Sequence, residues 1–336
     1  YGTHMAEWWE HDITNLVKKD YNHPCVIMYS IGNEIPETGN KFDTQWGKKL
    51  ADKLRSLDDS RYVTNSLNLM LSIMDRLGEM KEQMAAQAEA KANAKDSDGK
   101  ELGENAEINS MMSSMGDMMN MLIGSEIAGK ATEEAFAQVD IAGYNYAQCR
   151  YESDAKRYPN RIIVGSETFP KDLDENWELV EKHPYVIGDF SWTAWDYLGE
   201  AGIGKILYEE QPGMGFYAPY PYKAAYCGDL NLLGDRRPVS YWREMIWGLQ
   251  KAPYLSVQLP QYYGITTQMT NWSMTNAVRS WNWNGYEGKP AVVEVYTDAE
   301  EAELYINGEL KERKAVGEKK KYIAEFDTIY MPGVVE

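Results

Sequence analysis

Short apolar runs alternate with amphipathic segments along residues 1–252 of the chain. The runs are too short for helices and rich in β-branched residues, which is typical of strands. They occupy residues 26–33, 61–65, 139–143, 162–165 and 186–190. Segments with apolar residues at helical spacing accompany them, at 6–19, 43–57, 132–138, 151–158, 173–182 and 240–249. This alternation predicts an α/β fold with a parallel sheet, and the unbroken apolar run that leads to Glu34 predicts a strand buried on both faces.

Two of the predicted strands run directly into a carboxylate. Glu34 follows the first run after Gly-Asn, and Glu167 follows the run at 162–165 after Gly-Ser. In a β/α barrel the carboxyl ends of the strands form the floor of the active site. A lone glutamate at a strand end is more often part of a structural ion pair. Two on separate strands of one sheet are what a glycosidase requires, and this favours the catalytic interpretation.

Four segments resemble glycoside hydrolase family 2, the β-galactosidase family. Residues 23–34, with His-Pro and Ser-Ile-Gly-Asn-Glu, resemble its acid/base signature, and residues 165–170, Gly-Ser-Glu-Thr-Phe-Pro, resemble its nucleophile strand. Residues 140–146 and 188–196 resemble two further strands of its catalytic barrel. The motifs occur in the family's order, and the resemblance covers nearly the whole chain. It implies an O-glycosyl hydrolase that removes terminal β-linked sugars, foremost β-galactosides.

The resemblance also implies roles for the residues at the strand ends. Glu167 is expected to be the nucleophile and Glu34 the acid/base of a retaining, double-displacement reaction, with the two carboxyls roughly 5–5.5 Å apart. Asn33 is expected to bind the 2-hydroxyl of the sugar, and its alternative role is to cap a turn. No cofactor or metal is expected, because the sequence has no His-Glu-x-x-His pattern and no Cys/His cluster.

Aromatic residues in two of the motifs are further candidates. The resemblance implies that Tyr146 donates a hydrogen bond to Glu167, whereas Tyr144 is assigned to the core. It also implies that Trp192 forms the floor of the sugar subsite, and Trp195 is assigned to packing. A composition with 12% aromatic residues suits this interpretation, because flat rings stack on the apolar faces of pyranoses.

The predicted domains are a partial (β/α)8 TIM barrel at 1–252 and an immunoglobulin-like β-sandwich at 253–336. In the second domain, alternating patterns predict strands at 278–283, 292–296, 302–306 and 322–326, and Asn307-Gly308 predicts a hairpin turn. A closed barrel has eight strands, so we expect the first strands to be missing and the sandwich to be truncated. The strand edges would then pair in a homo-oligomer or with an absent N-terminal part. A Met-rich insert at about 68–131 is predicted to form two helices joined by a polar loop. It could form an adaptable wall over the site, or it could pack on itself or on a neighbouring subunit.

The net charge and the sequence motifs limit the classes of partner that the protein can bind. The formal net charge of −18 argues against nucleic acid, and no run is apolar enough to span a membrane, so a carbohydrate substrate is the expected partner. Gly199–Lys205 resembles a phosphate loop, but Ile206 replaces the required Ser or Thr. Three cysteines, expected as buried free thiols, leave the compartment undetermined between secreted, periplasmic and cytoplasmic.

Two alternative functions stay open. Within the family, the chain could belong to a β-glucuronidase or a β-mannosidase. The Asn-x-Lys clamp that family glucuronidases use for the uronate carboxylate is not found at 232–238, which favours a galactosidase. In another class, the chain could be a non-catalytic carbohydrate-binding or assembly fragment. A pure binding module has no use for two carboxylates at strand ends, so Glu34 and Glu167 favour an enzyme.

Overall fold

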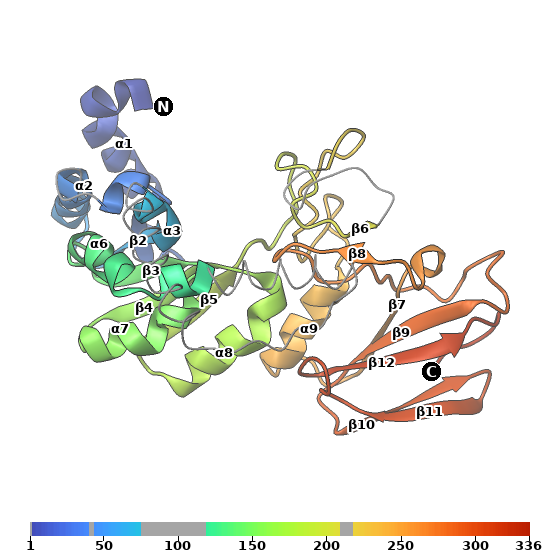
Figure 1. Cartoon of the computed structure of the whole chain (residues 1–336). Coiled ribbons are helices and arrows are strands. Elements are labelled where there is room, and N and C mark those ends of the chain that lie inside the picture. Colours follow the sequence, from blue (N-terminus) through green and yellow to red (C-terminus); the bar gives the residue numbers. More distant parts are fainter. Residues whose placement is uncertain (1, 40–43, 75–118, 209–217) are drawn as a thin grey trace, which may run out of the picture. The chain divides into compact units, whose positions relative to one another are not determined.

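A computed structural model describes residues 2–39, 44–74, 119–208 and 218–336 (Figure 1). The chain divides into two compact units. Unit 1 comprises Tyr1–Glu167 and His183–Asp189, and unit 2 comprises Thr168–Lys182 and Phe190–Glu336. This grouping by packing does not test the predicted domain boundary at 252/253, which stays a prediction. Most of the predicted Met-rich insert lies outside the described residues.

Unit 1 contains the sheet that the alternating pattern predicts. It is five-stranded with the order β1-β2-β3-β4-β5, and the first four strands are paired in parallel. The strands are β1 (Met28–Asn33), β2 (Tyr62–Asn68), β3 (Ile141–Asn145), β4 (Ile162–Thr168) and β5 (Val186–Ser191). The described α-helices of unit 1 are α1 (Met5–Asp20), α2 (Thr44–Leu57), α3 (Leu69–Ser72), α6 (Glu126–Phe136) and α7 (Tyr151–Arg157). The described 3₁₀ turns of unit 1 are η1 (Gly2–His4), η2 (Pro36–Gly39) and η4 (Gln148–Arg150). Sequential parallel strands of this kind are typical of a partial β/α barrel.

The register of the sheet brings polar residues into one row at the carboxyl ends of the strands. Asn68 of β2 lies opposite Asn145 of β3, and Asn145 lies opposite Glu167 of β4. Asn33 of β1 lies opposite Ser66. The register shifts just before the row, between Ser30 and Asn33 and between Tyr144 and Asn145. Such irregularities are frequent beside active sites, because they change the direction in which a side chain points.

The first strand is buried on one face only, which corrects the prediction of burial on both faces. Tyr29 and Ile31 pack into a core with Leu50 and Leu54 of α2, whereas Ser30 is exposed. Ile27, just before the strand, is also exposed. The reason is that α1 and α2 supply apolar side chains to one face of β1, and no described residue buries Ser30 on the other face.

An ion pair ties the starts of β1 and β2 together. Arg61 donates to the buried carboxylate of Asp58 at 2.5 Å and to the carbonyl oxygen of Val26 at 2.7 Å. Hydrogen bonds from Ser60, reinforced by Arg61, lower the pKa of Asp58 to about 2. The carboxylate is therefore ionised throughout the neutral range and fixes the turn from α2 into β2.

A buried polar network connects α7 to β3. Asp154 of α7 is 1% exposed, pairs with Arg150 and lies 3.1 Å from Arg161. It also accepts a hydrogen bond of 2.6 Å from the hydroxyl of Tyr144, the residue just before Asn145. Burial raises the pKa of Tyr144, so its hydroxyl keeps its proton and remains a donor. Tyr144 is fully buried, as predicted for a core residue.

We expect Asp154→Asn to lower the free energy of unfolding by about 3–5 kcal/mol, because it removes one charge of a buried ion cluster and leaves the two guanidinium groups unpaired. The measurement is urea denaturation followed by circular dichroism and fluorescence. Asp52→Asn is the matched control, since Asp52 pairs with Lys48 on the surface, where both side chains are more than half exposed. Equal shifts of the two denaturation midpoints would contradict a stabilising role for the network.

Unit 2 begins with η5 (Pro170–Asp172) and α8 (Leu173–Lys182), and its remaining elements follow β5. These are β6 (Leu207–Tyr208), α9 (Pro238–Ile246), β7 (Tyr254–Val257), η6 (Pro260–Tyr262), β8 (Thr267–Gln268), β9 (Pro290–Tyr296), β10 (Glu301–Ile306), β11 (Glu309–Ala315) and β12 (Ile323–Ile329). The sheet β12-β9-β7 and the hairpin β10-β11 form an all-β part, shown in orange and red in Figure 1. Leu304 of β10 shares a core with Val293 and Phe326, so the two sheets pack face to face.

The turn and strand predictions for this part are confirmed with one exception. Asn307 and Gly308 have φ of 54° and 77° and join β10 to β11, as expected of a tight hairpin turn. Residues 278–283, predicted as a strand, form only an isolated bridge from Val278 to Val257. The reason is that the aromatic side chains of this segment bind elsewhere: the indole N–H of Trp281 donates to the carbonyl oxygen of Met331.

Two other properties concern the whole described chain. The prediction of three buried thiols is wrong for Cys25 and Cys149, which are exposed, whereas Cys227 is buried. Burial raises the pKa of Cys227 to about 12, so this thiol is not a nucleophile at neutral pH. None of the described helices combines the length and the apolar character that a membrane crossing requires.

Candidate active site

The residues that directly follow β1 and β3 have an unusual backbone conformation. Glu34 and Tyr146 have φ of 53° and 54°, in the left-handed region that non-glycine residues rarely adopt. Their backbone N–H groups still donate to neighbouring strands, to the carbonyl oxygens of Ser66 and Glu167, each at 2.8 Å. Such strain costs about 1–3 kcal/mol and persists where the surrounding structure holds it, often at functional sites. Both side chains therefore leave their strands at the carboxyl edge of the sheet.

Asn145 connects the two glutamates. Its side-chain nitrogen lies 3.1 Å from Oε1 of Glu34 and 3.2 Å from Oε2 of Glu167, and 3.0 Å from Oδ1 of Asn33. The orientation of the amide is fixed from the other side, because its Oδ1 accepts a hydrogen bond of 2.7 Å from the hydroxyl of Ser166. Asn145 is 1% exposed, so its position is set by packing as well as by hydrogen bonds.

These contacts limit the distance between the two carboxylates. Since both oxygens lie within 3.2 Å of one nitrogen, they can be no further apart than the sum of the two hydrogen bonds. That limit applies to Oε1 of Glu34 and Oε2 of Glu167, and it is compatible with the roughly 5–5.5 Å between the two carboxyl groups of retaining glycosidases. Both glutamates are half-buried, so they are shielded in part but can still be reached by a ligand.

Glu167 receives hydrogen bonds on both of its oxygens. The hydroxyl of Tyr146 donates to Oε1 at 2.5 Å, as the sequence predicts, and Asn145 donates to Oε2. Donors of this kind favour the ionised form of a carboxyl group, because they stabilise its negative charge. They also hold the carboxylate plane in one orientation. Both carboxylate oxygens of Glu167 are therefore held in place by donors from the neighbouring strand region.

Glu34 receives its hydrogen bonds differently. Asn68 donates to Oε1 at 2.9 Å, and Asn145 donates to the same oxygen. Asn68 is held by a second contact, because its Oδ1 caps α3 by accepting from the backbone N–H of Met70. In the part of the chain that the structure describes, Oε2 of Glu34 takes part in no hydrogen bond. This oxygen is therefore available for contact with a ligand.

The other predicted site residues fall into two places. Asn33 is exposed next to Glu34, and it accepts from Asn145 instead of capping a turn. Trp192 belongs to unit 2, where it packs on the core of Ile203, Ala225 and Cys227. Its role at a sugar subsite stays a prediction. Trp195, assigned to packing, is 56% exposed, so that assignment is wrong; it stands at a bridge to Leu230 with its ring outside the core.

Sequence reasoning missed Asn68, Asn145 and Ser166. The signal was available for Asn145, which precedes Tyr146 at the end of an apolar run, the same context that identified Asn33. Asn68 was missed because the predicted strand ended at Asn65, three residues before β2 ends. Among the described residues, no group of three or more His, Cys, Asp or Glu side chains is arranged to hold a metal ion.

Comparison with known sequences and structures assigns the chain to a family. Residues 3–120 match the profile "Glycosyl hydrolases family 2, TIM barrel domain". A glycosyl hydrolase family 2 member from Bacteroides cellulosilyticus is 31% identical with a TM-score of 0.73, over 100% of this chain and 36% of that one. The chain belongs to glycoside hydrolase family 2. The parallel sheet of unit 1 is accordingly part of the family's TIM barrel.

Two curated relatives cover most of the chain at low identity. The "Beta-galactosidase BoGH2A" of Bacteroides ovatus is 22% identical over 96% of this chain, and a "Putative beta-glucuronidase" of Formosa agariphila is 21% identical over 90%. The chain spans 35% and 25% of their respective lengths. Residues 288–336 match "Domain of unknown function (DUF4982)", which falls within the all-β part of unit 2.

Proposed function

We propose that the full-length protein hydrolyses terminal β-linked glycosides and retains the anomeric configuration. The observation that carries this proposal is the single amide of Asn145, which lies within hydrogen-bond distance of both Glu34 and Glu167. A shared amide donor supports a short separation of the two carboxylates. A short separation favours retention, in which one carboxylate attacks while the other transfers a proton, over inversion, in which a water molecule must fit between a carboxylate and the sugar.

The hydrogen bonds support one assignment of roles. A carboxylate oxygen of Glu167 attacks the anomeric carbon while the bond to the leaving oxygen breaks, and Glu34 gives its proton to that oxygen. In the second step Glu34 takes a proton from water, and the water oxygen displaces Glu167 from the sugar. Tyr146 and Asn145 stabilise the charge of Glu167, and Oε2 of Glu34 is open to exchange the proton. We assign the contact with the 2-hydroxyl of the sugar to Asn33, whose Oδ1 accepts from Asn145.

A β-galactoside is the substrate that we propose. Two observations support it: the similarity to a β-galactosidase extends over 96% of this chain, and residues 232–238 contain no Asn-x-Lys clamp. A β-glucuronide is the second candidate, because a putative β-glucuronidase also covers most of the chain. Both candidates share the carboxylate pair, so the choice between them concerns the binding of the sugar and not the chemistry of cleavage.

The full-length protein is expected to release nitrophenol from the β-galactoside at least about tenfold faster than from the β-glucuronide or β-mannoside, since each hydroxyl or carboxylate left unpaired in the site costs about 1–3 kcal/mol. The measurement is kcat/KM for these three nitrophenyl glycosides, which form the nitrophenyl panel. Proton NMR then identifies the anomer of the sugar that is released first. Release of the β-anomer first is expected. First appearance of the α-anomer would rule out retention, and a faster glucuronide would replace the proposed substrate but not the mechanism.

A further inference from the structure

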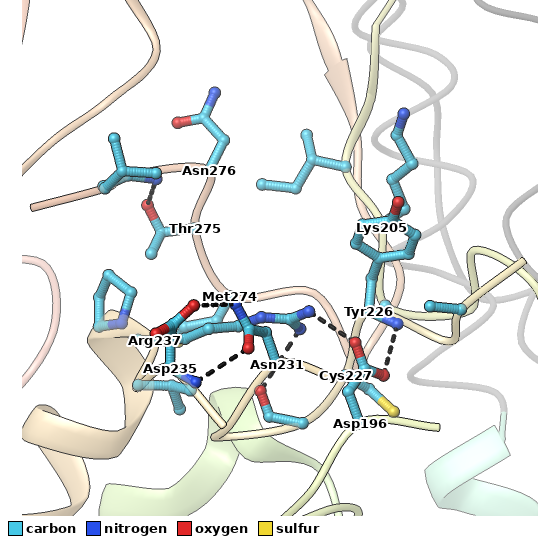
Figure 2. Close-up of a pocket in the computed structure, with 18 of the residues that line it drawn as sticks. Asp196, Lys205, Tyr226, Cys227, Asn231, Asp235, Arg237, Met274, Thr275 and Asn276 are labelled. Atoms are coloured by element: carbon cyan, nitrogen blue, oxygen red, sulfur yellow. Dashed lines mark hydrogen bonds and ion pairs between the residues drawn. The ribbon is translucent and has the colours of Figure 1, made fainter. Parts of the chain in front are cut away.

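Unit 2 contains a pocket whose lining includes two residues of the four motifs, Pro170 and Asp196, but neither Glu34 nor Glu167. Its volume is about 680 Å³, within the range of roughly 300–1,000 Å³ that small-molecule sites occupy. Asp196 and residues from the stretches 204–208, 222–237 and 259–279 line most of it. Figure 2 shows Lys205 and Tyr226 on one side, Thr275 and Asn276 on the other, and Arg237 reaching Asp196 between them. Polar groups therefore line two facing sides of the pocket.

The floor of the pocket is neutral and rigid. Asp196 is 5% exposed and pairs with Arg237 at 2.6 Å. Its other oxygen accepts from the backbone N–H of Tyr226 at 2.9 Å and of Tyr197 at 3.1 Å. Because both oxygens of Asp196 are already bound within the protein, this pair positions the pocket and does not supply a free charge for a ligand.

Tyrosine rings form much of the walls. Tyr208 and Tyr262 are stacked with centroids 3.5 Å apart, and Tyr222 and Tyr226 meet edge to face at 6.1 Å. Asn276 donates to the hydroxyl of Tyr208 at 2.5 Å, which uses one of the four hydrogen bonds that an amide can make. Flat rings beside amide groups are what a pyranose requires, because its faces are apolar and its edge carries hydroxyls. The walls thus suit a sugar ring.

The net charge of the residues that line the pocket is positive, whereas the net charge of the chain is negative. Four cationic residues line it, Lys205, Arg236, Arg237 and Arg279, against the acidic residues Asp196 and Asp235. The formal net charge of the chain is −18. Arg236 and Arg237 are paired with Glu244 and Asp196. Within the described ranges, Lys205 and Arg279 meet no carboxylate, and each lies beside a tyrosine ring, with the amine of Lys205 3.3 Å from the centroid of Tyr222.

We propose that this pocket binds a saccharide residue that carries an acidic substituent, a carboxylate or a sulfate. The sugar ring packs against the tyrosine walls, Asn276 binds its hydroxyls, and Lys205 pairs with the anion. Lys205 is half-buried, so its charge is less screened than that of a surface lysine and favours an anion more strongly. The site recognises an acidic glycan in addition to the sugar that is cleaved, and it does not depend on the proposed hydrolysis.

The test is a titration of the full-length protein, followed by ligand-observed NMR, with three probes: methyl β-glucuronide, methyl β-galactoside 6-sulfate and methyl β-galactoside. The protein carries Glu34→Gln and Glu167→Gln, so that no probe is cleaved. We expect one or both acidic probes to bind at least about tenfold more tightly than the neutral probe. The comparison between the two acidic probes shows whether carboxylate or sulfate is preferred.

Lys205→Met is expected to abolish this preference, because methionine keeps the packing against Tyr222 but not the charge. Arg279→Met provides a second variant at the same pocket and should weaken acidic probes only. Lys223→Met is the matched control: Lys223 is an exposed lysine 5.9 Å from the ring of Tyr220 and does not line the pocket. Equal binding of all probes, no saturable binding, or a preference that survives Lys205→Met would each overturn the proposal. None of these results bears on hydrolysis, which the nitrophenyl panel tests separately.

Discussion

Glu167→Gln in the full-length protein is expected to lower kcat by at least about 10⁴-fold for every substrate of the nitrophenyl panel. Glutamine keeps the size of the side chain and can still bond to Tyr146 and Asn145, but it cannot attack the anomeric carbon. The loss should therefore not depend on the leaving group, since no glycosyl-enzyme intermediate forms at all. The measurement is the initial rate at saturating substrate, with thermal unfolding to show that the fold is retained.

Glu133→Gln is a suitable control for that loss, because Glu133 is an exposed residue of α6. Its rate should stay within about twofold of the parent, as is usual for surface substitutions. A second result can identify an error in the assignment of roles. If azide restored turnover of Glu167→Ala with a β-glycosyl azide and that of Glu34→Ala with an α-glycosyl azide, the two roles would have to be exchanged, because azide in place of a missing nucleophile gives the inverted product.

Glu34→Ala is expected to show a loss that depends on the leaving group. Proton transfer contributes about 10²–10⁴-fold, and this contribution is needed most when the leaving oxygen is a poor leaving group. We expect unactivated alkyl β-galactosides to lose about that factor in kcat/KM, whereas dinitrophenyl substrates should lose far less in the first step. Added azide should increase the turnover of the activated substrates and yield a β-glycosyl azide, because azide attacks the intermediate without a general base.

The matched control for this variant is Glu37→Ala, since Glu37 is an exposed glutamate three positions further along the chain. It should retain parental rates and show no response to azide. An equal loss for alkyl and dinitrophenyl substrates in Glu34→Ala would contradict the acid/base role. It would instead indicate that Glu34 only orients Asn145, the residue that it shares with Glu167.

The positions of the two glutamates illustrate how far local pattern reaches. A short apolar run followed by Gly-Asn-Glu or Gly-Ser-Glu identifies a strand and the residue at its carboxyl end, because side-chain periodicity and strand length are local properties. The sequence could therefore place Glu34, Glu167 and Tyr146 at strand ends. It could not find the contribution of Asn68, because the end of β2 depends on pairing with β3 and not on the residues of β2 alone.

The predicted burial of the first strand failed for a related reason. An apolar run indicates that a segment can be buried. The elements that pack against the segment determine whether one face or both faces are buried. Tyr29 and Ile31 are covered by helices, whereas Ser30 is exposed among the described residues. In the same way, the aromatic residues at 278–283 are compatible with a strand by pattern, but hydrogen bonds such as that from Trp281 to Met331 hold the segment in another conformation.

The sequence by itself determined the alternation of strands and helices, the hairpin at Asn307-Gly308 and the carboxylates at the strand ends, because each depends on a few consecutive residues. Only the tertiary structure decided that Asn145 joins both glutamates, since this depends on the register of four strands that are distant in sequence. The orientation of that amide depends in turn on Ser166, one strand away. Distances between side chains on different strands follow from packing, which no local pattern encodes.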